Sequence, residues 1–243
     1  MTTDLFETAQ TDNATDALVM THAVIEAART RNAAEGLVMT NAVIETMLSR
    51  SATKYYDPEA VLTDEQIAAL VEIGTSAPTS FNLQNWRFVA VRSPEAKARL
   101  RPIAWNQAMT TEAAVTFVIV GQLADASTVP AVFAPMVEAG YMRKDHVPEA
   151  EKGARSIYDD NPQQQRDEAI RTATFGAAAI IYAARSMGWG STPMIGFDAA
   201  AVRTEYGLAN NEIPVMLLSV GPMREGNWPS KPRRPVLDVL SFR

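Results

Sequence analysis

The chain has 243 residues, 47% of them apolar, so it is long enough to bury a substantial core. Its net charge of −6 argues against a nucleic-acid-binding surface, and the absence of cysteine excludes disulfide scaffolds, thiolate catalysis and cysteine-ligated metals. Neither histidine, His22 or His146, lies near a motif that would complete a metal site or a triad, so no metal is expected.

The N-terminus does not resemble a secretory signal. The longest apolar run, residues 173–184, is shorter than a membrane span, so we expect a cytoplasmic protein with no membrane partner.

The N-terminal part of the chain contains a near-duplication, because residues 13–26 recur with few changes as residues 32–45. Both copies predict amphipathic helices, and two copies are too few for a repeat solenoid. We predict that residues 1–31 form an N-terminal extension and that residues 32–243 form the main domain. The favoured interpretation of the first copy is an added surface helix, and the alternative is an arm that clasps a partner subunit.

The predicted elements begin with a helix over residues 62–75, in which Thr63 is the N-cap and Gln66 completes a capping box. The elements that follow are a strand at 88–92, a helix from 94 to about 111, an apolar strand at 115–121, a less regular region at 125–165 rich in proline and charge, a long helix at 167–187, a short helix from Asp198 to Tyr206 and a buried strand at 215–220. The tail from Pro222 is extended and could add a strand to another subunit. Mixed strands and helices without a Gly-x-Gly-x-x-Gly motif predict an α+β fold.

The most informative segment is residues 78–88, Pro-Thr-Ser-Phe-Asn-Leu-Gln-Asn-Trp-Arg-Phe, which joins a predicted helix to a predicted strand. Thr79 and Ser80 offer hydroxyls, and Asn82 and Gln84 offer amides that both donate and accept hydrogen bonds. Loops of this chemistry between regular elements often carry binding groups. An ordinary helix-to-strand turn is the competing interpretation, since proline, serine and asparagine are common in turns.

Three further motifs accompany this loop, at residues 49–58, 188–198 and 230–235. In this order and spacing, the four stretches resemble the FMN-dependent nitroreductase family from about residue 42 to residue 233. The resemblance implies an α+β, nitroreductase-like fold with a central, mainly antiparallel sheet flanked by helices, in an intertwined homodimer. Residues 32–243 would then be the FMN-binding domain.

The resemblance also implies which residues bind FMN. They are Arg50, Ser51, Ala52 and Lys54 at the phosphate and the pyrimidine side of the ring; Pro78, Thr79, Ser80 and Asn82 from the second subunit; Asn106; Pro193, Met194, Ile195 and Gly196 near the reactive nitrogen; and Lys231 and Arg233 over the phosphate. No side chain is implied as catalytic, because flavin N5 accepts the hydride. The sequence departs from many relatives at Ile195, where they carry an acidic residue, and at Asn85, where they carry proline.

The implied function is an FMN-dependent oxidoreductase that takes hydride from NADH or NADPH and reduces small electron-poor molecules, such as nitroaromatics or quinones, in a ping-pong mechanism. One alternative keeps the fold and FMN but changes the reaction to dehalogenation, enal reduction or dehydrogenation. Another is a flavin-binding protein without turnover.

Overall fold

The computed structural model describes residues 41–243, so the predicted N-terminal extension and most of the second repeat copy lie outside the described residues. The described residues fall into two compact units. Ala52–Asn227 forms the larger unit, and residues 41–51 with Trp228–Arg243 form the smaller unit.

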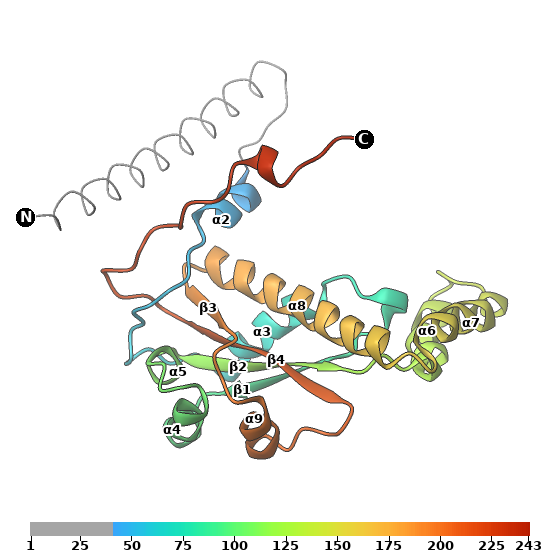
Figure 1. The fold of residues 1–243 in the computed structure, drawn as a ribbon, viewed down its shortest axis with the longest axis horizontal. Helices are drawn as coiled ribbons and strands as arrows, with labels where there is room; N and C mark the ends of the chain where they lie inside the picture. The colour runs from blue at the N-terminus through green and yellow to red at the C-terminus, as the bar shows by residue number, and fades with distance from the viewer. Residues whose placement is uncertain (1–40) are drawn as a thin grey trace, which may run out of the picture. The chain divides into compact units, whose positions relative to one another are not determined.

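A four-stranded sheet forms the centre of the larger unit (Figure 1). Its strands are β1 (Trp86–Val91), β2 (Val115–Gln122), β3 (Gly190–Met194) and β4 (Glu212–Gly221). They are arranged in the order β1-β2-β4-β3, and every pairing is antiparallel. This confirms the predicted antiparallel sheet and places β3 at an edge.

Helices cover both faces of this sheet, as Figure 1 shows. On one face lie α3 (Asp64–Thr75) and α8 (Pro162–Ser186); on the other lie α4 (Pro94–Ile103), α5 (Met109–Glu112) and α9 (Ala199–Glu205). Because side chains alternate along a strand, Phe117 and Ile119 of β2 pack under α3 and α8, whereas Val118 and Val120 face α4 and α9. A strand covered on both faces requires a continuous apolar sequence, and β2 has one.

The helix predicted over residues 94–111 is broken, which corrects the prediction. α4 ends at Ile103, one residue after Pro102, and a turn separates it from α5. Trp105 and Asn106 adopt left-handed backbone conformations, with φ of 54° and 59°. Few residues other than glycine adopt such values. Asparagine does so more often than most, but tryptophan does not, so the sequence gives little indication of this turn.

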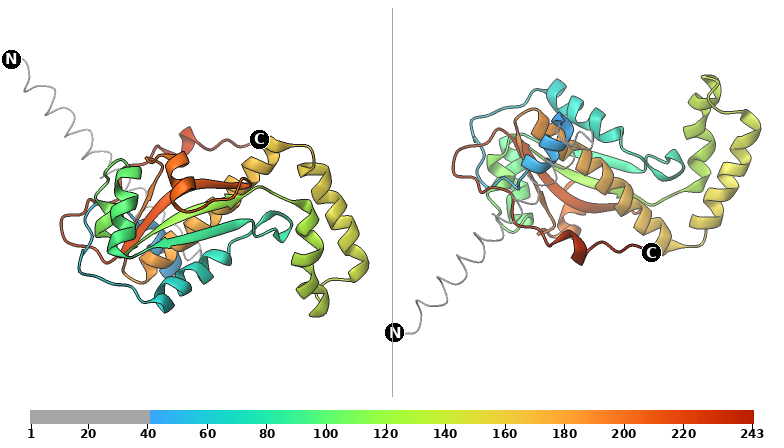
Figure 2. Two further views of the ribbon diagram at one scale, coloured as in Figure 1. Left: turned by 90° about the horizontal axis from the view of Figure 1, so that it is seen from below. Right: turned by 90° about the horizontal axis from the view of Figure 1, so that it is seen from above.

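Residues 125–165, predicted to be less regular, instead form a helical hairpin. Its helices are α6 (Val129–Glu138) and α7 (Val147–Tyr158), and each carries proline in its first turn. Proline is favoured at that position, where its missing N–H costs no hydrogen bond. Both views in Figure 2 show this α6–α7 hairpin beyond one end of the sheet.

Most other predicted elements are present with shifted ends. The capping box of Thr63 and Gln66 is confirmed at the start of α3, and Asp198 caps α9 as predicted. α8 begins at Pro162, earlier than predicted, because Asn161 is its N-cap. The strand β3 was not predicted, since its sequence GSTPM lacks the β-branched and aromatic pattern of a strand.

The smaller unit contains α2 (Ala42–Ser49), capped by Asn41, and a short 3-10 helix, η4 (Val236–Asp238). The hydroxyl of Ser230 donates to the carbonyl oxygen of Arg50 at 2.8 Å. Within this unit, the bond joins the first and the last of the four sequence motifs. Among residues 41–243, no helix has the length and apolar character needed to cross a membrane.

Candidate active site

The segment after Ser51 runs alongside the edge strand β3. Ala52 forms a parallel bridge with Ser191, and the backbone N–H of Thr53 donates to the Ser191 carbonyl at 3.2 Å. Because side chains alternate along an extended segment, Thr53 is buried while Ala52 and Lys54 are exposed. The larger unit therefore presents Ala52 and Lys54 outward from one edge of the sheet.

Buried hydroxyls hold this edge in place. The Thr192 hydroxyl donates to the carbonyl oxygen of Thr53, and the Tyr56 hydroxyl lies 2.9 Å from Thr192 Oγ1 and 3.1 Å from the Ser219 carbonyl oxygen. Burial raises the pKa of Tyr56 well above its usual value, so this tyrosine stays neutral at physiological pH. Such a network fixes both segments, because breaking it would leave buried polar groups without partners.

The segment that follows β3 carries the residues expected near the flavin ring. Pro193 and Ile195 are exposed, Ile195 to 83%, whereas Met194 is buried in the core shared with α4 and α9. A side chain at Gly196 would have its Cβ within 3.0 Å of the indole ring of Trp105. A larger residue at position 196 would therefore require the Trp105 indole to move slightly.

The turn after α4 is hydrogen-bonded to the segment that follows β3. Asn106 is exposed and left-handed, and the backbone N–H of Asp198 donates to the Ile103 carbonyl at 2.9 Å. The side chain of Gln107 donates to the Gly196 carbonyl at 2.7 Å. The structure thus brings the Asn106 turn and the Pro193–Gly196 segment together, as the motif match expects of residues that share one ligand.

The loop with Pro78, Thr79, Ser80 and Asn82 connects α3 to β1 through the short 3-10 helix η1 (Ser80–Asn82). Thr79 Oγ1 accepts from the backbone N–H of Gln84 at 3.2 Å. The Ser80 hydroxyl lies 2.8 Å from that of Tyr158 at the end of α7. The loop is therefore attached to the α6–α7 hairpin, a contact that sequence patterns do not reveal.

Asn85, the residue that stands where many relatives have proline, is buried. Its side-chain nitrogen donates to the Gln122 carbonyl at 2.6 Å, and its backbone carbonyl accepts from the Gln122 N–H at 2.8 Å. Its Oδ1 is buried without a partner in the described part of the chain. Asn85 thus fastens the loop to the end of β2.

The smaller unit gathers the remaining expected residues. Ser230, which precedes Lys231, bonds to the carbonyl oxygens of Leu48 and Arg50. The Arg233 guanidinium donates to the Lys231 carbonyl at 2.8 Å. Three of the four expected phosphate-binding cations, Arg50, Lys231 and Arg233, therefore belong to one compact unit although they lie at opposite ends of the sequence.

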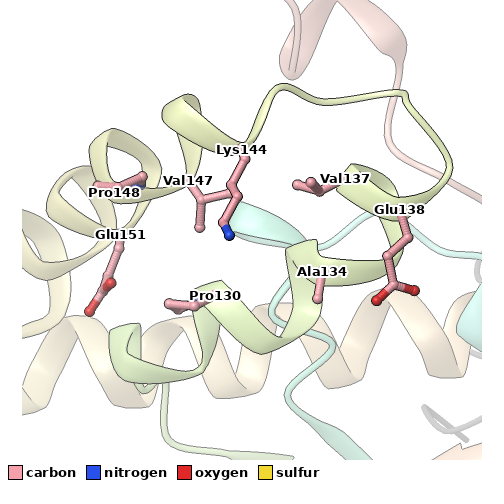
Figure 3. Close-up of a pocket in the computed structure, with 8 residues that line it drawn as sticks. All are labelled: Pro130, Ala134, Val137, Glu138, Lys144, Val147, Pro148 and Glu151. Carbon is pink, nitrogen blue, oxygen red and sulfur yellow. The ribbon is translucent and has the colours of Figure 1, made fainter.

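A hollow of about 460 Å³ lies between α6 and α7 (Figure 3). Its lining is mostly apolar: Pro130, Ala134, Val137, Glu138, Lys144, Val147, Pro148 and Glu151. No expected cofactor residue lines it. Across residues 41–243, no cluster of histidine, aspartate or glutamate has an arrangement suited to a metal ion.

Comparison with known proteins identifies the family. The profile of the nitroreductase family matches residues 47–222. YodC of Bacillus subtilis, provisionally named an NAD(P)H nitroreductase, is 30% identical over 171 residues, covering 70% of this chain and 84% of YodC. An NADH dehydrogenase of Thermus thermophilus is 32% identical over 189 residues, covering 76% of this chain and 86% of that protein.

Solved structures show the same fold. A protein of Exiguobacterium sibiricum, provisionally named a nitroreductase and solved in complex with FMN, superposes with a TM-score of 0.77 at 24% identity. The match covers 84% of this chain and 98% of that one. The chain belongs to the nitroreductase family, which confirms the resemblance read from its motifs, the nitroreductase-like α+β fold and the oxidoreductase class.

Proposed function

We propose that this protein is an FMN-dependent oxidoreductase that takes hydride from NADH or NADPH and passes reducing equivalents to a small electron-poor molecule. Family membership supports this, since relatives are named for NAD(P)H nitroreductase and NADH dehydrogenase activity and a structural neighbour holds FMN. The observation that carries the proposal is the convergence of the Ala52–Lys54, Asn106 and Pro193–Gly196 segments around β3.

The chemistry of the residues present fits FMN. Lys54 offers a cation for a phosphate, and Asn82 and Asn106 offer amides for hydroxyls and ring atoms. Exposed Pro193 and Ile195 offer an apolar surface for a planar ring. When bound, FMN supplies hydride chemistry that no amino-acid side chain performs.

The protein's own part in the reaction is orientation and exclusion of water. The backbone of the Pro193–Gly196 segment holds the N–H groups of this segment in place. Ile195 within the segment and Trp105 next to Gly196 present apolar side chains that are 83% and 67% exposed. We propose that these side chains contact the hydride donor and then the acceptor, which use the same space in turn. Nitroaromatics and quinones suit such a surface because they are planar and largely apolar.

The individual binding assignments remain part of this proposal. In the larger unit they are Ala52, Lys54, Pro78, Thr79, Ser80, Asn82, Asn106, Pro193, Met194, Ile195 and Gly196; in the smaller unit they are Arg50, Ser51, Lys231 and Arg233. A homodimer, in which Pro78, Thr79, Ser80 and Asn82 serve the other subunit's cofactor, is likewise proposed on the family pattern. A cytoplasmic location is also proposed, because NADH and NADPH would be available to the protein there.

One experiment tests the reaction directly. The purified protein, loaded with FMN, is mixed anaerobically with NADH and then with NADPH while flavin absorbance is recorded. Bleaching by either donor, followed by recovery of the yellow colour on adding a quinone, is the expected result. A flavin-loaded protein that neither donor bleaches would support the alternative of flavin binding without turnover. Bleaching without recovery by quinones or nitroaromatics would support a different acceptor reaction.

A second experiment tests the phosphate contacts. We expect Lys54→Ala and Arg233→Ala each to weaken FMN binding by about ten- to a hundredfold, because a charge-assisted hydrogen bond contributes roughly 1.5–3 kcal/mol. Lys152→Ala, which removes an exposed lysine from α7, is the control. Unchanged affinity in both test variants would remove these residues from the site.

The N-terminal extension, residues 1–31, is proposed to be dispensable for FMN binding and turnover, because all four motifs follow it. Deleting residues 2–31 should lower the melting temperature while leaving flavin content and NAD(P)H oxidation unchanged. Loss of flavin in a folded deletion variant would show instead that the extension contributes to the active site.

A further inference from the structure

The hydroxyl of Tyr158 joins three elements that are distant in the sequence. It lies at the end of α7, 2.8 Å from Ser80 Oγ and 3.2 Å from Glu168 Oε2 of α8. Glu168 is only 3% exposed and also accepts hydrogen bonds from Arg171 and, at 3.0 Å, from Thr172. A buried carboxylate with three donors around it is a fixed acceptor, because moving it would leave the donors unpaired.

The Tyr158 hydroxyl is the donor in both of these contacts. It donates to Ser80 Oγ at 2.8 Å, and Glu168 Oε2, which as a carboxylate oxygen can only accept, lies 3.2 Å from the same hydroxyl. Since Ser80 Oγ accepts this bond, its own proton remains available to another partner.

The loop that carries Ser80 needs such a restraint. Phe81, Asn82 and Gln84 all have left-handed backbone conformations, with φ of 49°, 52° and 47°. Non-glycine residues avoid this region unless the surroundings impose it. The ring of Phe81 packs edge-on against that of Tyr158, with centroids 6.3 Å apart, so Tyr158 restrains this loop through an aromatic contact as well as a hydrogen bond.

We propose that Tyr158, supported by Glu168, is a positioning residue that fixes the Ser80 hydroxyl and the left-handed loop in the conformation that binds FMN. This inference rests on the proposed FMN-dependent function. It assigns a role to two residues that belong to none of the four sequence motifs, and it makes the α6–α7 hairpin a support of the cofactor loop.

The test variant is Tyr158→Phe, which removes one oxygen atom and keeps the ring contact with Phe81. Tyr206→Phe is the matched control, because the Tyr206 hydroxyl is buried without a hydrogen-bond partner in the described part of the chain. We expect Tyr158→Phe to raise the Kd for FMN about three- to tenfold, the effect of one hydrogen bond. Tyr206→Phe should leave the Kd unchanged.

A double-mutant cycle separates positioning from general packing. If Tyr158 acts through Ser80, Tyr158→Phe should have no further effect on the Kd when Ser80→Ala is already present. Additive effects of the two substitutions would overturn the proposal, as would a wild-type Kd in Tyr158→Phe.

Amide hydrogen exchange of residues 79–85 in the flavin-free protein completes the test without relying on FMN. We expect faster exchange in Tyr158→Phe than in the wild type or Tyr206→Phe. If the wild type takes up no FMN, the proposed function fails. Faster loop exchange in Tyr158→Phe would still support the positioning role in that case, and unchanged exchange would overturn it.

Discussion

The side-chain nitrogen of Gln107 lies 2.7 Å from the carbonyl oxygen of Gly196 and donates a hydrogen bond to it. The same nitrogen donates to the Ala104 carbonyl at 3.0 Å. These two bonds tie the turn after α4 to the segment after β3. Asn106 and Ile195, both expected to meet the flavin, are immediate neighbours of the bonded pair, so Gln107 helps to hold them together, as does the bond from the Asp198 N–H to the Ile103 carbonyl.

We expect Gln107→Leu to lower the free energy of unfolding by about 1 kcal/mol, because it removes a donor shared by two carbonyls. FMN affinity should fall with it, since only the backbone bond from Asp198 to Ile103 is then left of the two bonds described between the turn and the segment. Urea denaturation and FMN titration measure the two effects. Gln163→Leu, in the exposed first turn of α8, is the control. A Gln107→Leu variant with the stability and FMN affinity of the wild type would contradict this role.

Replacing Ile195 with glutamate should change acceptor preference and leave the fold intact. The side chain is 83% exposed, so the change in folding stability should stay within about 0.5 kcal/mol. A carboxylate there would repel anionic acceptors by on the order of 1 kcal/mol, about fivefold in rate, and less at high salt. Steady-state rates with a neutral and a sulfonated quinone provide the measurement.

Ile195→Gln serves as the uncharged control for that substitution. If Ile195→Glu and Ile195→Gln reduce both quinones to the same extent, the charge has no access to the acceptor. Ile195 would then lie outside the acceptor's path.

The proposed homodimer makes a prediction about Phe175, which is 48% exposed in the middle of α8 beside the small residues Ala178 and Ala179. An obligate interface buries more than about 2,000 Å², and an unpaired carboxylate inside it costs several kcal/mol. We therefore expect Phe175→Asp to raise the dimer dissociation constant by about a hundredfold or more.

Sedimentation velocity at sub-micromolar concentration measures this effect. The wild type should sediment as a dimer, and so should Val61→Asp, which places the same charge at an apolar position that is 82% exposed. A fully active, FMN-bound wild-type monomer would refute both the dimer and the assignment of Thr79, Ser80 and Asn82 to the neighbouring site.

Stability should depend on pH through Glu212. Burial by itself would raise the pKa of this carboxyl, but hydrogen bonds from the Ala209 N–H at 2.9 Å and the Gln122 amide, together with the Arg87 guanidinium at 2.8 Å, outweigh burial and lower the pKa. A depressed folded-state pKa stabilises the protein above the unfolded-state value, near 4.5, and this stabilisation is lost as pH falls through the folded-state pKa.

Glu212→Gln should consequently lower the free energy of unfolding by about 1–2 kcal/mol at pH 7, because it weakens the charge-assisted bonds at this site while the Arg87 side chain, 38% exposed, stays partly solvated. The difference from the wild type should shrink as pH falls below about 4.5. Urea unfolding at a series of pH values measures it. A difference that stays constant down to pH 3 would show that the carboxylate charge is not what stabilises this site.

Local signals in the sequence predicted local structure well. The Thr63–Gln66 capping box, the Asp198 cap and the apolar run of β2 each depend on a few neighbouring residues, and all three are present. The break after α4 was missed because it depends on the left-handed backbone of Trp105 and Asn106, for which a single asparagine is only a weak signal. The hairpin was missed because its prolines, taken as irregular structure, instead begin helices.

In the candidate site, too, the features that depend on neighbouring residues were predicted and those that depend on distant contacts were not. The four motifs were recognisable because each is a short run of sequence. Residues 52–58 and 188–198 lie together at β3 in the larger unit, and residues 49–51 and 230–235 lie in the smaller unit. The side chains that hold these segments in place could not be predicted from the sequence. Tyr158 contacts Ser80, 78 positions away, and Gln107 contacts Gly196, 89 positions away. Contacts of that length depend on the packing of α7, α4 and β3, which no local pattern specifies.

The α6–α7 hairpin packs in a small core that is distinct from the cores on the two faces of the sheet. Ala126, Phe133 and Ala154 pack there with Tyr158 and with Leu83 of the loop that carries Ser80. An exchanged hairpin must therefore fit Leu83 as well as Ser80. Chimeras that swap residues 125–160 while retaining the side chains that meet Leu83 and Ser80 are a practical way to change how this loop is held without disturbing the two cores of the sheet.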